Sequence, residues 1–383
     1  MGATSKRPVR SAQVVLHLSQ SQIATDPRIL RAIEWGNRAG FCARGIGIRD
    51  ETVPLPSAGS GIIDLSWRFR TTIFGKIVGS LVVGLRMFAR SVETRPDVVH
   101  CHQFYVLPVA FLVSLTLRVP IVYDAHELES LSANRGKLSG SLVRSLERLC
   151  SKRMAAVITV CEEISEWYQR QFPKLRVFEI YNVPAIDPTR DNSLIENEVV
   201  ATRGQFDLEV LYIGRTSEGR ETGRLLEVQG MRESSIRISF LGWPPSPKSS
   251  KGGGSGSDNT RYLGAADHRD VVHIARHFDV GVVLLDLASV SYQNSLPNKF
   301  WELVYAGVPV LASRSNAIES VAIDFPNVIL VDDVLETVDD WHGAVRMAAK
   351  LGKRAVGDVP VQYSQEEMIR RLKLMYGLCF RCQ

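Results

Sequence analysis

Apolar and polar positions alternate along this chain in a repeating pattern. Between residues 14 and 331, short runs of β-branched and aliphatic residues are followed by amphipathic segments of helical length. Continuous apolar runs are typical of strands buried on both faces of a parallel sheet, and the segments between them are typical of crossover helices. The pattern therefore predicts an α/β fold built from βαβ units.

The apolar runs form two series separated by a polar stretch with two prolines. The strands predicted are residues 14–18, 43–48, 97–101, 120–124, 156–160 and 176–180 in the first series, and 208–213, 237–241, 280–284, 308–312 and 328–331 in the second. Two doubly wound sheets in series indicate two facing domains. The predicted division is a Rossmann-like domain over 1–185, a linker over 186–205, a second Rossmann-like domain over 206–360, and a C-terminal helix over 361–383 that is able to cross back to the first domain.

Length and composition agree with two ordinary globular domains. A chain of 383 residues exceeds the usual size of one hydrophobic core, and 45% apolar with 23% charged residues excludes a disordered chain. The net charge of +5 is too small to indicate a nucleic-acid-binding protein. Six scattered cysteines and an N-terminus without a signal-peptide pattern favour reduced thiols and a cytoplasmic location.

Two segments bear on membranes. Residues 67–90 combine aliphatic and aromatic side chains with five basic residues and no acid, as in helices that lie on anionic lipid. A helix that packs its apolar face on the sheet explains the same residues, so both interpretations stay open. The apolar run at 104–117 is too short to span a bilayer and predicts a buried crossover helix.

The segment from Asn294 to Val310 has the strongest chemical content. It reads as a loop, a helix, a glycine stop and a buried strand. Helices that start at the carboxyl edge of a sheet offer unpaired N–H groups to an anion such as a diphosphate. One turn into this helix, Glu302 is placed to accept hydrogen bonds from a ribose diol, and Lys299 lies on the same face. The alternative is an ordinary solvated Glu–Lys pair.

Several segments, in the same order, resemble family 4 glycosyltransferases of the GT-B fold. They are LPNKFWELVYAGVPVLAS in the second half, and PDVVHCHQFYVLPVA, VPIVYDAHELES and VITVCEEISEWYQRQF in the first. The resemblance runs from residue 14 to about 331. It implies two facing Rossmann-like domains with the donor bound by the second and the acceptor by the first.

On the donor side, the resemblance implies that Glu302 holds the nucleotide ribose. The family commonly carries another glutamate eight positions earlier, but this chain has Asn294 there. Sugar contacts would then come from an amide or from backbone N–H groups nearby. Diphosphate contacts are implied for a glycine turn after the strand at 208–213 and for a basic pair beside it. The donor set is Gly214, Asn294, Ser295, Leu296, Asn298 and Glu302, with Arg215, Arg220 and Lys299 neutralising the leaving diphosphate.

On the acceptor side, His126 matches a histidine that relatives place near the donor sugar, with Asp124 and Glu127 as neighbours that could orient it. Asp26 has the residue type of a helix N-cap and is followed by proline. Arg28 could reach acceptor or phosphate from that helix start, and a D-x-R form occurs in part of the family. His102 is expected at the same edge of the sheet. The acceptor set is Asp26, Arg28, His102 and Glu127.

The resemblance implies a retaining, metal-independent glycosyltransferase without a cofactor, acting on a nucleotide sugar and a glycan or lipid-linked acceptor. Assembly of a cell-surface polysaccharide, with peripheral contact to the inner face of the membrane, is the expected setting. Two alternatives stay open, a non-catalytic nucleotide-sugar-binding scaffold and a GT-B nucleotide-sugar epimerase. A nicotinamide dehydrogenase is disfavoured because no G-x-G-x-x-G follows the first strand.

Overall fold

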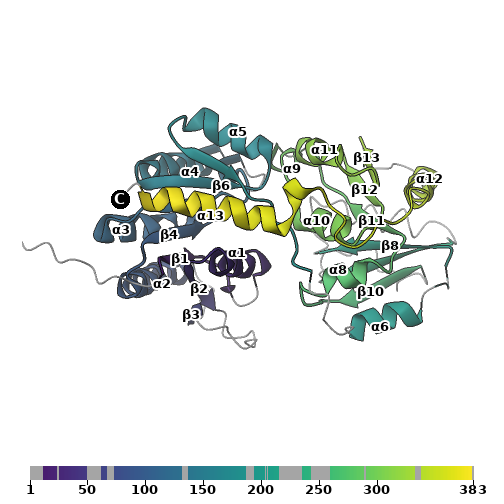
Figure 1. The fold of residues 1–383 in the computed structure, drawn as a ribbon, viewed down its shortest axis with the longest axis horizontal. Coiled ribbons are helices and arrows are strands. Elements are labelled where there is room, and N and C mark those ends of the chain that lie inside the picture. The colour runs from purple at the N-terminus through teal and green to yellow at the C-terminus, as the bar shows by residue number, and fades with distance from the viewer. Residues whose placement is uncertain are drawn as a thin grey trace, which may run out of the picture.

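The computed structural model of the chain has two lobes, each built around a parallel sheet (Figure 1). It describes residues 12–23, 26–49, 62–66, 73–131, 137–186, 194–202, 204, 206–214, 235–242, 259–288, 290–332 and 338–381. The predicted fold class, two Rossmann-like α/β units in series, is confirmed.

The first lobe contains a seven-stranded sheet with the strand order β3-β2-β1-β4-β5-β6-β7. Its strands are β1 (Val14–Leu18), β2 (Cys42–Arg49), β3 (Ile62–Ser66), β4 (Val98–His102), β5 (Ile121–Asp124), β6 (Met154–Thr159) and β7 (Arg176–Glu179). All neighbouring pairs are parallel. The central strands are fully buried because helices cover both faces of the sheet, which is why their sequences are continuously apolar.

The helices of the first lobe form two layers. One layer contains α2 (Ile73–Thr94), α3 (Leu107–Leu117) and α4 (Lys137–Cys150), with α2 against α3 and α3 against α4. The remaining helices are α1 (Pro27–Arg38) and α5 (Glu162–Gln171), and short 3₁₀ turns lie at Phe104–Val106, Glu129–Leu131 and Ser151–Arg153. Among the described residues, none of the helices is both long enough and apolar enough to cross a bilayer.

The second lobe repeats the architecture with a six-stranded parallel sheet in the order β10-β9-β8-β11-β12-β13. Its strands are β8 (Leu208–Ile213), β9 (Ile236–Leu241), β10 (Thr260–Gly264), β11 (Val280–Val283), β12 (Val310–Ser313) and β13 (Val328–Val331). Its helices are α6 (Leu194–Ala201), α8 (Val271–Ala275), α9 (Val290–Gln293), α10 (Asn298–Tyr305), α11 (Asn316–Ala322) and α12 (Val338–Ala349), with a 3₁₀ turn at Val361–Tyr363.

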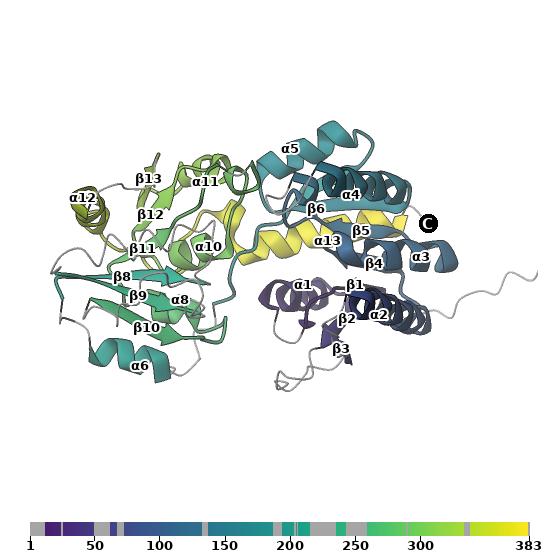
Figure 2. The ribbon, with the colours of Figure 1, turned by 180° about the vertical axis from the view of Figure 1, so that it is seen from behind.

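The last helix, α13 (Gln365–Arg381), leaves the second lobe and packs on the first. It contacts α1 and strands β4, β6 and β7, and Figure 2 shows it running along the first lobe from behind. Met368, Leu372, Met375 and Cys379 on its inner face are almost completely buried. The predicted apolar stripe therefore docks on the sheet of the opposite lobe.

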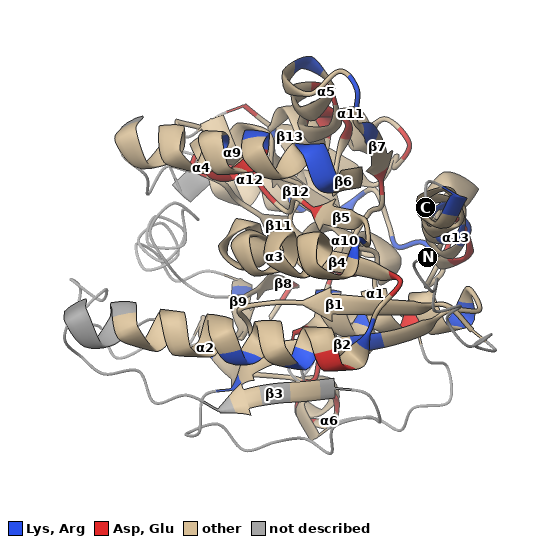
Figure 3. Cartoon of the chain, turned by 90° about the vertical axis from the view of Figure 1, so that its left-hand side faces the viewer, with Lys and Arg blue, Asp and Glu red and all other residues tan. Residues whose placement is uncertain are grey.

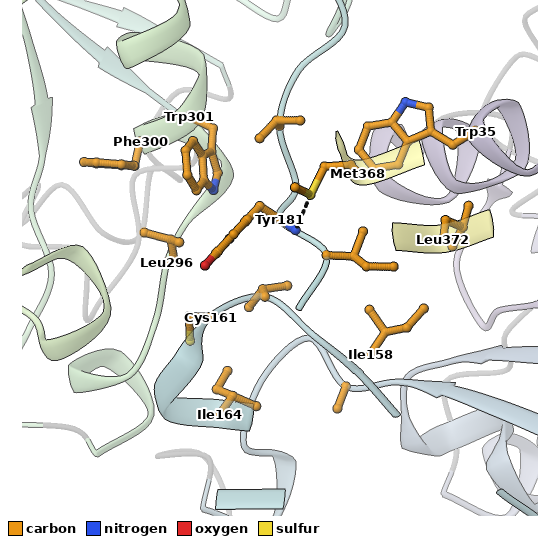
Figure 4. Close-up of a cluster of buried hydrophobic side chains, with 14 of the residues drawn as sticks. Trp35, Ile158, Cys161, Ile164, Tyr181, Leu296, Phe300, Trp301, Met368 and Leu372 are labelled. Atoms are coloured by element: carbon orange, nitrogen blue, oxygen red, sulfur yellow. Dashed lines mark hydrogen bonds between the residues drawn. The ribbon is translucent and has the colours of Figure 1, made fainter. Parts of the chain in front are cut away.

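A continuous apolar cluster joins the two lobes around Tyr181, in the segment that connects them (Figure 4). The Tyr181 ring lies 5.3 Å from that of Trp301 on α10, and its backbone N–H donates to the sulfur of Met368 at 3.1 Å. Side chains from α5, α10 and α13 meet here. The lobes are thus held together by a shared core as well as by the covalent connection.

Three expectations need correction. Strands β3 and β10 were not predicted, because both lie at a sheet edge and their sequences, IIDLS and TRYLG, mix polar with apolar residues. Helix α6 occupies part of the predicted linker. The segment at 104–117 does contain a helix, but Leu112 and Leu115 of α3 are half-exposed, so only one side of that helix is buried.

Candidate functional site

The carboxyl ends of β1, β4 and β5 meet where the strand order of the first sheet reverses. Successive crossovers run toward β2 on one side and toward β5 on the other, so this point is the topological switch point of the sheet. Pairing aligns His17 of β1 with His100 of β4, and His102 of β4 with Asp124 of β5. The sequence thereby gathers three histidines and a carboxylate at the edge where α/β proteins bind ligands.

Asp124 is the centre of this group. Its carboxylate pairs with the guanidinium of Arg28, with Nε at 3.2 Å from Oδ2 and a second, shorter contact from the terminal nitrogen. The same Oδ2 lies 3.0 Å from Nδ1 of His102 and 3.2 Å from Nε2 of His126. The side chain of Asp124 is only 4% exposed. One buried carboxylate therefore faces one guanidinium and several imidazoles.

Burial and pairing act in opposite directions on this carboxylate. Burial alone disfavours the ion, but the charges of Arg28 and His126, with smaller contributions from His100 and His102, hold the pKa of Asp124 well below its usual range. Burial lowers the pKa of His100, and it lowers the pKa of His102 together with repulsion from His100. At neutral pH the group thus contains an ionised Asp124 among neutral buried imidazoles.

The three buried histidines form a stack behind Asp124. The rings of His100 and His102 are 4.4 Å apart and nearly parallel, and Nδ1 of His17 lies 2.9 Å from Nε2 of His102. Nδ1 of His100 lies 2.6 Å from the hydroxyl of Tyr376 on α13. His102 has no exposed surface. His102 thus lies at the predicted edge of the sheet with its ring enclosed, and its role on the acceptor side stays a prediction.

Two sets of side chains could in principle hold a metal ion among the described residues. They are His17 with His100 and His102, and His102 with Asp124 and His126. In the first set, His17 and His102 already share a hydrogen bond of 2.9 Å, and Nδ1 of His100 lies 2.6 Å from the hydroxyl of Tyr376, so these nitrogens have partners within the protein. In the second set, the cation of Arg28 already pairs with the carboxylate. The site therefore fits a metal poorly, and metal independence stays a prediction.

The start of α1 supplies Arg28. Asp26 caps this helix by accepting hydrogen bonds from the backbone N–H groups of Arg28 at 3.1 Å and Ile29 at 3.4 Å, with Pro27 in the first turn. The N-cap assignment is thus confirmed. The side chain of Arg28 is 12% exposed and pairs with Asp124. An acceptor or a phosphate could therefore contact only the small exposed part of its guanidinium.

His126 is the most accessible member of the group. Its side chain is 18% exposed, while Asp124 contacts it from below. Glu127, the other predicted orienting residue, is exposed on the following loop. The acceptor-side residues thus divide into a buried charge centre at Asp124 and one imidazole that reaches the surface.

In the second lobe, α10 begins beside the end of β8. Lys299 is buried, with its ammonium 4.2 Å from the centroid of the Tyr212 ring. Tyr212 precedes Gly214, which ends β8 with a φ of 115°. An added Cβ at Gly242 would lie 2.4 Å from the carbonyl oxygen of Gly214, so two backbone turns pass very close to each other here. The structure thereby brings together Lys299 and Gly214, two members of the predicted donor set.

Glu302 faces the first lobe. Burial raises the pKa of its carboxyl group, and the charges of Arg31 and Lys299 partly offset this effect. Arg31 comes from α1 and is itself buried, which lowers its pKa to about 10 despite the opposing influence of Glu302. Glu302 of the second lobe, the predicted ribose ligand, and Arg31 of the first lobe therefore influence each other's charge state.

A buried polar bridge accompanies this pair. The guanidinium of Arg31 donates to the side-chain oxygen of Asn182, whose amide donates to the side-chain oxygen of Asn298 at the start of α10. The bridge joins α1, the interlobe connection and the predicted donor site. Sequence reasoning identified neither Arg31 nor Asn182. The only local signal was a basic residue on the apolar side of an amphipathic helix.

The loop before α10 is already engaged in internal contacts. The amide of Asn294 donates to the carbonyl of Val290 at 2.9 Å, and its oxygen accepts from Asn316 at 3.3 Å. The backbone N–H of Ser295 donates to Tyr292 at 3.2 Å, and Leu296 is buried in the interlobe cluster. A donor sugar bound here would have to exchange some of these contacts. Arg215 and Arg220 lie outside the described residues.

A small cavity lies beside the Asp124 group, between the first lobe and α13. This cavity of about 20 Å³, lined by residues that include Arg28, His100, Asp124 and Asn182, has room for a water molecule but not for a sugar. A wider depression of about 510 Å³ lies on the second lobe beside Arg276 and Lys353 and contains none of the predicted site residues. We assign the site from the converging charged groups rather than from cavity size.

Comparisons with known proteins agree with this geometry. Residues 12–182 match the family model of the glycosyl transferase 4-like domain. No curated protein matches the chain in sequence.

Solved structures match over both lobes. Sucrose-phosphate synthase from Thermosynechococcus elongatus superposes with a TM-score of 0.70 at 14% identity, covering 97% of this chain and all of that one. HepE of Anabaena in complex with UDP-glucose gives 0.63 at 13% identity, covering 95% and 99%. UDP-N-acetylglucosamine 2-epimerase from Rickettsia bellii gives 0.60 at 13%, covering 96% of each. The first lobe thus matches the model of the glycosyl transferase 4-like domain in sequence, and the chain as a whole has the GT-B fold.

Proposed function

We propose that the protein is a retaining glycosyltransferase that moves a sugar from a nucleotide-sugar donor to a glycan or lipid-linked acceptor. The observation that carries the proposal is the meeting of two sets of charged groups across the lobes. Arg31 of α1 is joined by hydrogen bonds through Asn182 to Asn298 at the start of α10, and the charges of Arg31 and Lys299 both act on the carboxyl group of Glu302. Arg31 also lies one helical turn from Arg28, which pairs with Asp124. HepE, of similar fold, was solved with UDP-glucose, which supports a nucleotide sugar as the donor.

In the proposed reaction, the nucleotide lies on the second lobe. The carboxylate of Glu302 accepts from the ribose hydroxyls, and the diphosphate rests at the start of α10 next to Lys299 and the Gly214 turn. As the bond between the sugar and the diphosphate breaks, negative charge grows on the leaving oxygen. Lys299 stabilises that charge, together with Arg215 and Arg220. These side-chain cations make a metal ion and a cofactor unnecessary.

The acceptor lies on the first lobe, next to the exposed edge of His126. Asp124 holds that imidazole in place, as it holds Arg28. In a retaining reaction the acceptor hydroxyl attacks from the side of the leaving group, and a phosphate oxygen of the donor takes its proton. The role of His126 is then to orient the sugar by hydrogen bonding. Assembly of a cell-surface polysaccharide at the inner face of the membrane is the setting we propose.

Two alternatives have specific support. The epimerase from Rickettsia bellii shares the fold, which favours a nucleotide-sugar epimerase. The side chain of Asn294, which stands in place of a family glutamate, is bonded within its own lobe, which favours a non-catalytic binding protein. Product analysis separates the three, since only the transferase makes a new glycoside and only the epimerase changes the donor in the absence of an acceptor.

The first test is nucleotide binding, measured by thermal shift over a panel of nucleoside diphosphates and their sugars. We expect one nucleotide to stabilise the chain, by about 2.7 kcal/mol when its concentration is 100 times its Kd. Glu302→Ala should abolish this stabilisation. Glu198→Ala, at an exposed position on α6, is the matched control and should retain it. The absence of binding across the panel would exclude the transferase and the epimerase alike.

A further inference from the structure

Helices α2, α3 and α4 present an unusual row of exposed leucines. Each side chain in this set exposes between 50% and 85% of its surface: Leu81, Leu85, Leu112, Leu115, Leu138 and Leu142. The three helices pack side by side in one layer on the first sheet (Figure 3). We call the outer side of this layer the leucine face. Elsewhere, strongly exposed aliphatic residues such as Leu194 and Ile323 lie on separate helices.

The leucines point away from the sheet. On α2, the buried residues Val83 and Met87 face the lobe, whereas Leu81 and Leu85 lie on the opposite side of the helix. Leu138 and Leu142 follow the same four-residue spacing on α4. An amphipathic helix in a globular protein normally has a polar outer side. The outer side of these helices instead carries leucines, mixed on α4 with serines and arginines, so the leucine face is suited to contact another apolar phase.

Positive charge surrounds the leucine face. The sequences of the three helices contain six basic residues and two acidic ones. Of the acids, Glu147 is buried, and Glu93 pairs with Arg90 at 2.8 Å. Arg86, Arg144 and Arg148 are exposed. Long basic side chains can direct their charge toward lipid headgroups while neighbouring leucines enter the acyl boundary.

From this combination we propose that the leucine face docks on the surface of an anionic lipid bilayer. A flat apolar layer of three helices, edged by arginines, fits a surface that is apolar below and negatively charged above. A second copy of the chain is a poorer partner, because a two-fold contact would bring the same positive charges together. The proposal is independent of the catalytic assignment. It involves α3 and α4, which the sequence did not connect with lipid.

Docking would also orient the site. Helix α3 begins just after β4, whose last residue is His102, and α4 follows the loop that carries His126. Two of the three helices of the leucine face therefore belong to βα units that carry acceptor-side residues. If the protein transfers sugar, an acceptor anchored in the bilayer would approach the first lobe directly.

The test is sedimentation of the full chain with phosphatidylcholine vesicles that contain either no phosphatidylglycerol or 30 mol% of it. We expect binding to the anionic vesicles that weakens as salt is raised. Leu81→Gln/Leu85→Gln/Leu142→Gln should lower the partition coefficient about a thousandfold or more, which is the loss expected when three leucine side chains no longer enter the apolar phase. Arg144→Gln/Arg148→Gln should lower the partition coefficient about 20-fold, because two basic residues lose their attraction to the anionic surface.

The matched control is Leu194→Gln/Ile323→Gln, which removes two equally exposed aliphatic side chains from the second lobe and should leave the partition coefficient unchanged. Circular dichroism and thermal unfolding without ligand establish that each variant is folded. Unaltered vesicle binding by the leucine variant, or no binding by the wild type, would overturn the proposal. So would a dimer in sedimentation equilibrium that the same leucine substitutions dissociate. None of these results depends on donor binding, so failure here is distinct from failure of the transferase.

Discussion

Replacement of Asp124 by asparagine tests the charge centre of the first lobe. Asparagine has nearly the same shape, so the substitution removes the negative charge with little change in packing. It leaves Arg28, whose side chain is 12% exposed, without its counter-charge. Removing one member of a buried ion pair costs about 3–5 kcal/mol, because the remaining charge stays desolvated. We expect the lower part of that range, since the asparagine oxygen can still accept from Arg28.

The pH dependence of this loss has a definite sign. Asp124 has a folded-state pKa well below that of the unfolded chain, so it contributes stability above the unfolded pKa and loses it as pH falls through the folded pKa. The difference in stability between wild type and Asp124→Asn should thus be greatest near neutral pH and shrink in acid. His17, whose pKa burial lowers, destabilises both proteins as pH falls below about 6.5.

The assay is urea denaturation of the full chain at several pH values. Asp267→Asn, which alters an exposed pair with Arg269, is the control and should change the free energy of unfolding by about 0.5 kcal/mol or less. The double variant Arg28→Met/Asp124→Asn should be more stable than the sum of the single variants predicts, by about 1–3 kcal/mol. A loss below about 1 kcal/mol for Asp124→Asn, or strict additivity, would refute the reasoning.

Three further substitutions probe other parts of the molecule. Glu147→Gln should stabilise the chain above neutral pH, because burial raises the pKa of the Glu147 carboxyl group and the wild type loses stability as this group ionises. The free energy of unfolding should then depend less on pH, and unchanged urea curves at pH 8 would contradict this. Gly307→Ala should cost about 2–4 kcal/mol in thermal unfolding, since φ is +73° and the new Cβ would lie 2.2 Å from the carbonyl oxygen of Arg354. Tyr376→Phe should cost about 1–2 kcal/mol by leaving Nδ1 of His100 buried without its partner, and an unaltered melting temperature would argue against that contact.

Sequence alone was sufficient for the repeated architecture, because central parallel strands must be apolar on both faces. The strands at 14–18, 208–213 and 328–331 were predicted with the bounds that the structure has. Edge strands have no such requirement, since one side lacks a neighbour. β3 and β10 therefore carried no comparable signal.

The site was only partly predictable for a different reason. Asp124 and His126 follow a predicted strand, so their place at the sheet edge could be inferred. Whether a neighbouring side chain is buried depends on what packs over it. His100 is enclosed by Tyr376, a residue 276 positions later in the chain, and the hydrogen-bonded bridge from Arg31 through Asn182 to Asn298 exists only because two separate lobes meet. Such relations have no local sequence pattern.

The return of α13 to the first lobe affects how the chain is made. A ribosome releases the first lobe long before residues 365–381, so the sheet surface that Met368, Leu372 and Met375 will cover emerges uncovered. That surface stays uncovered until the whole second lobe has been synthesised. The first lobe is therefore exposed to aggregation until the last helix arrives, and a chain that stops early would leave both lobes incomplete. Folding of the N-terminal half thus depends on a helix that is synthesised after the whole second lobe.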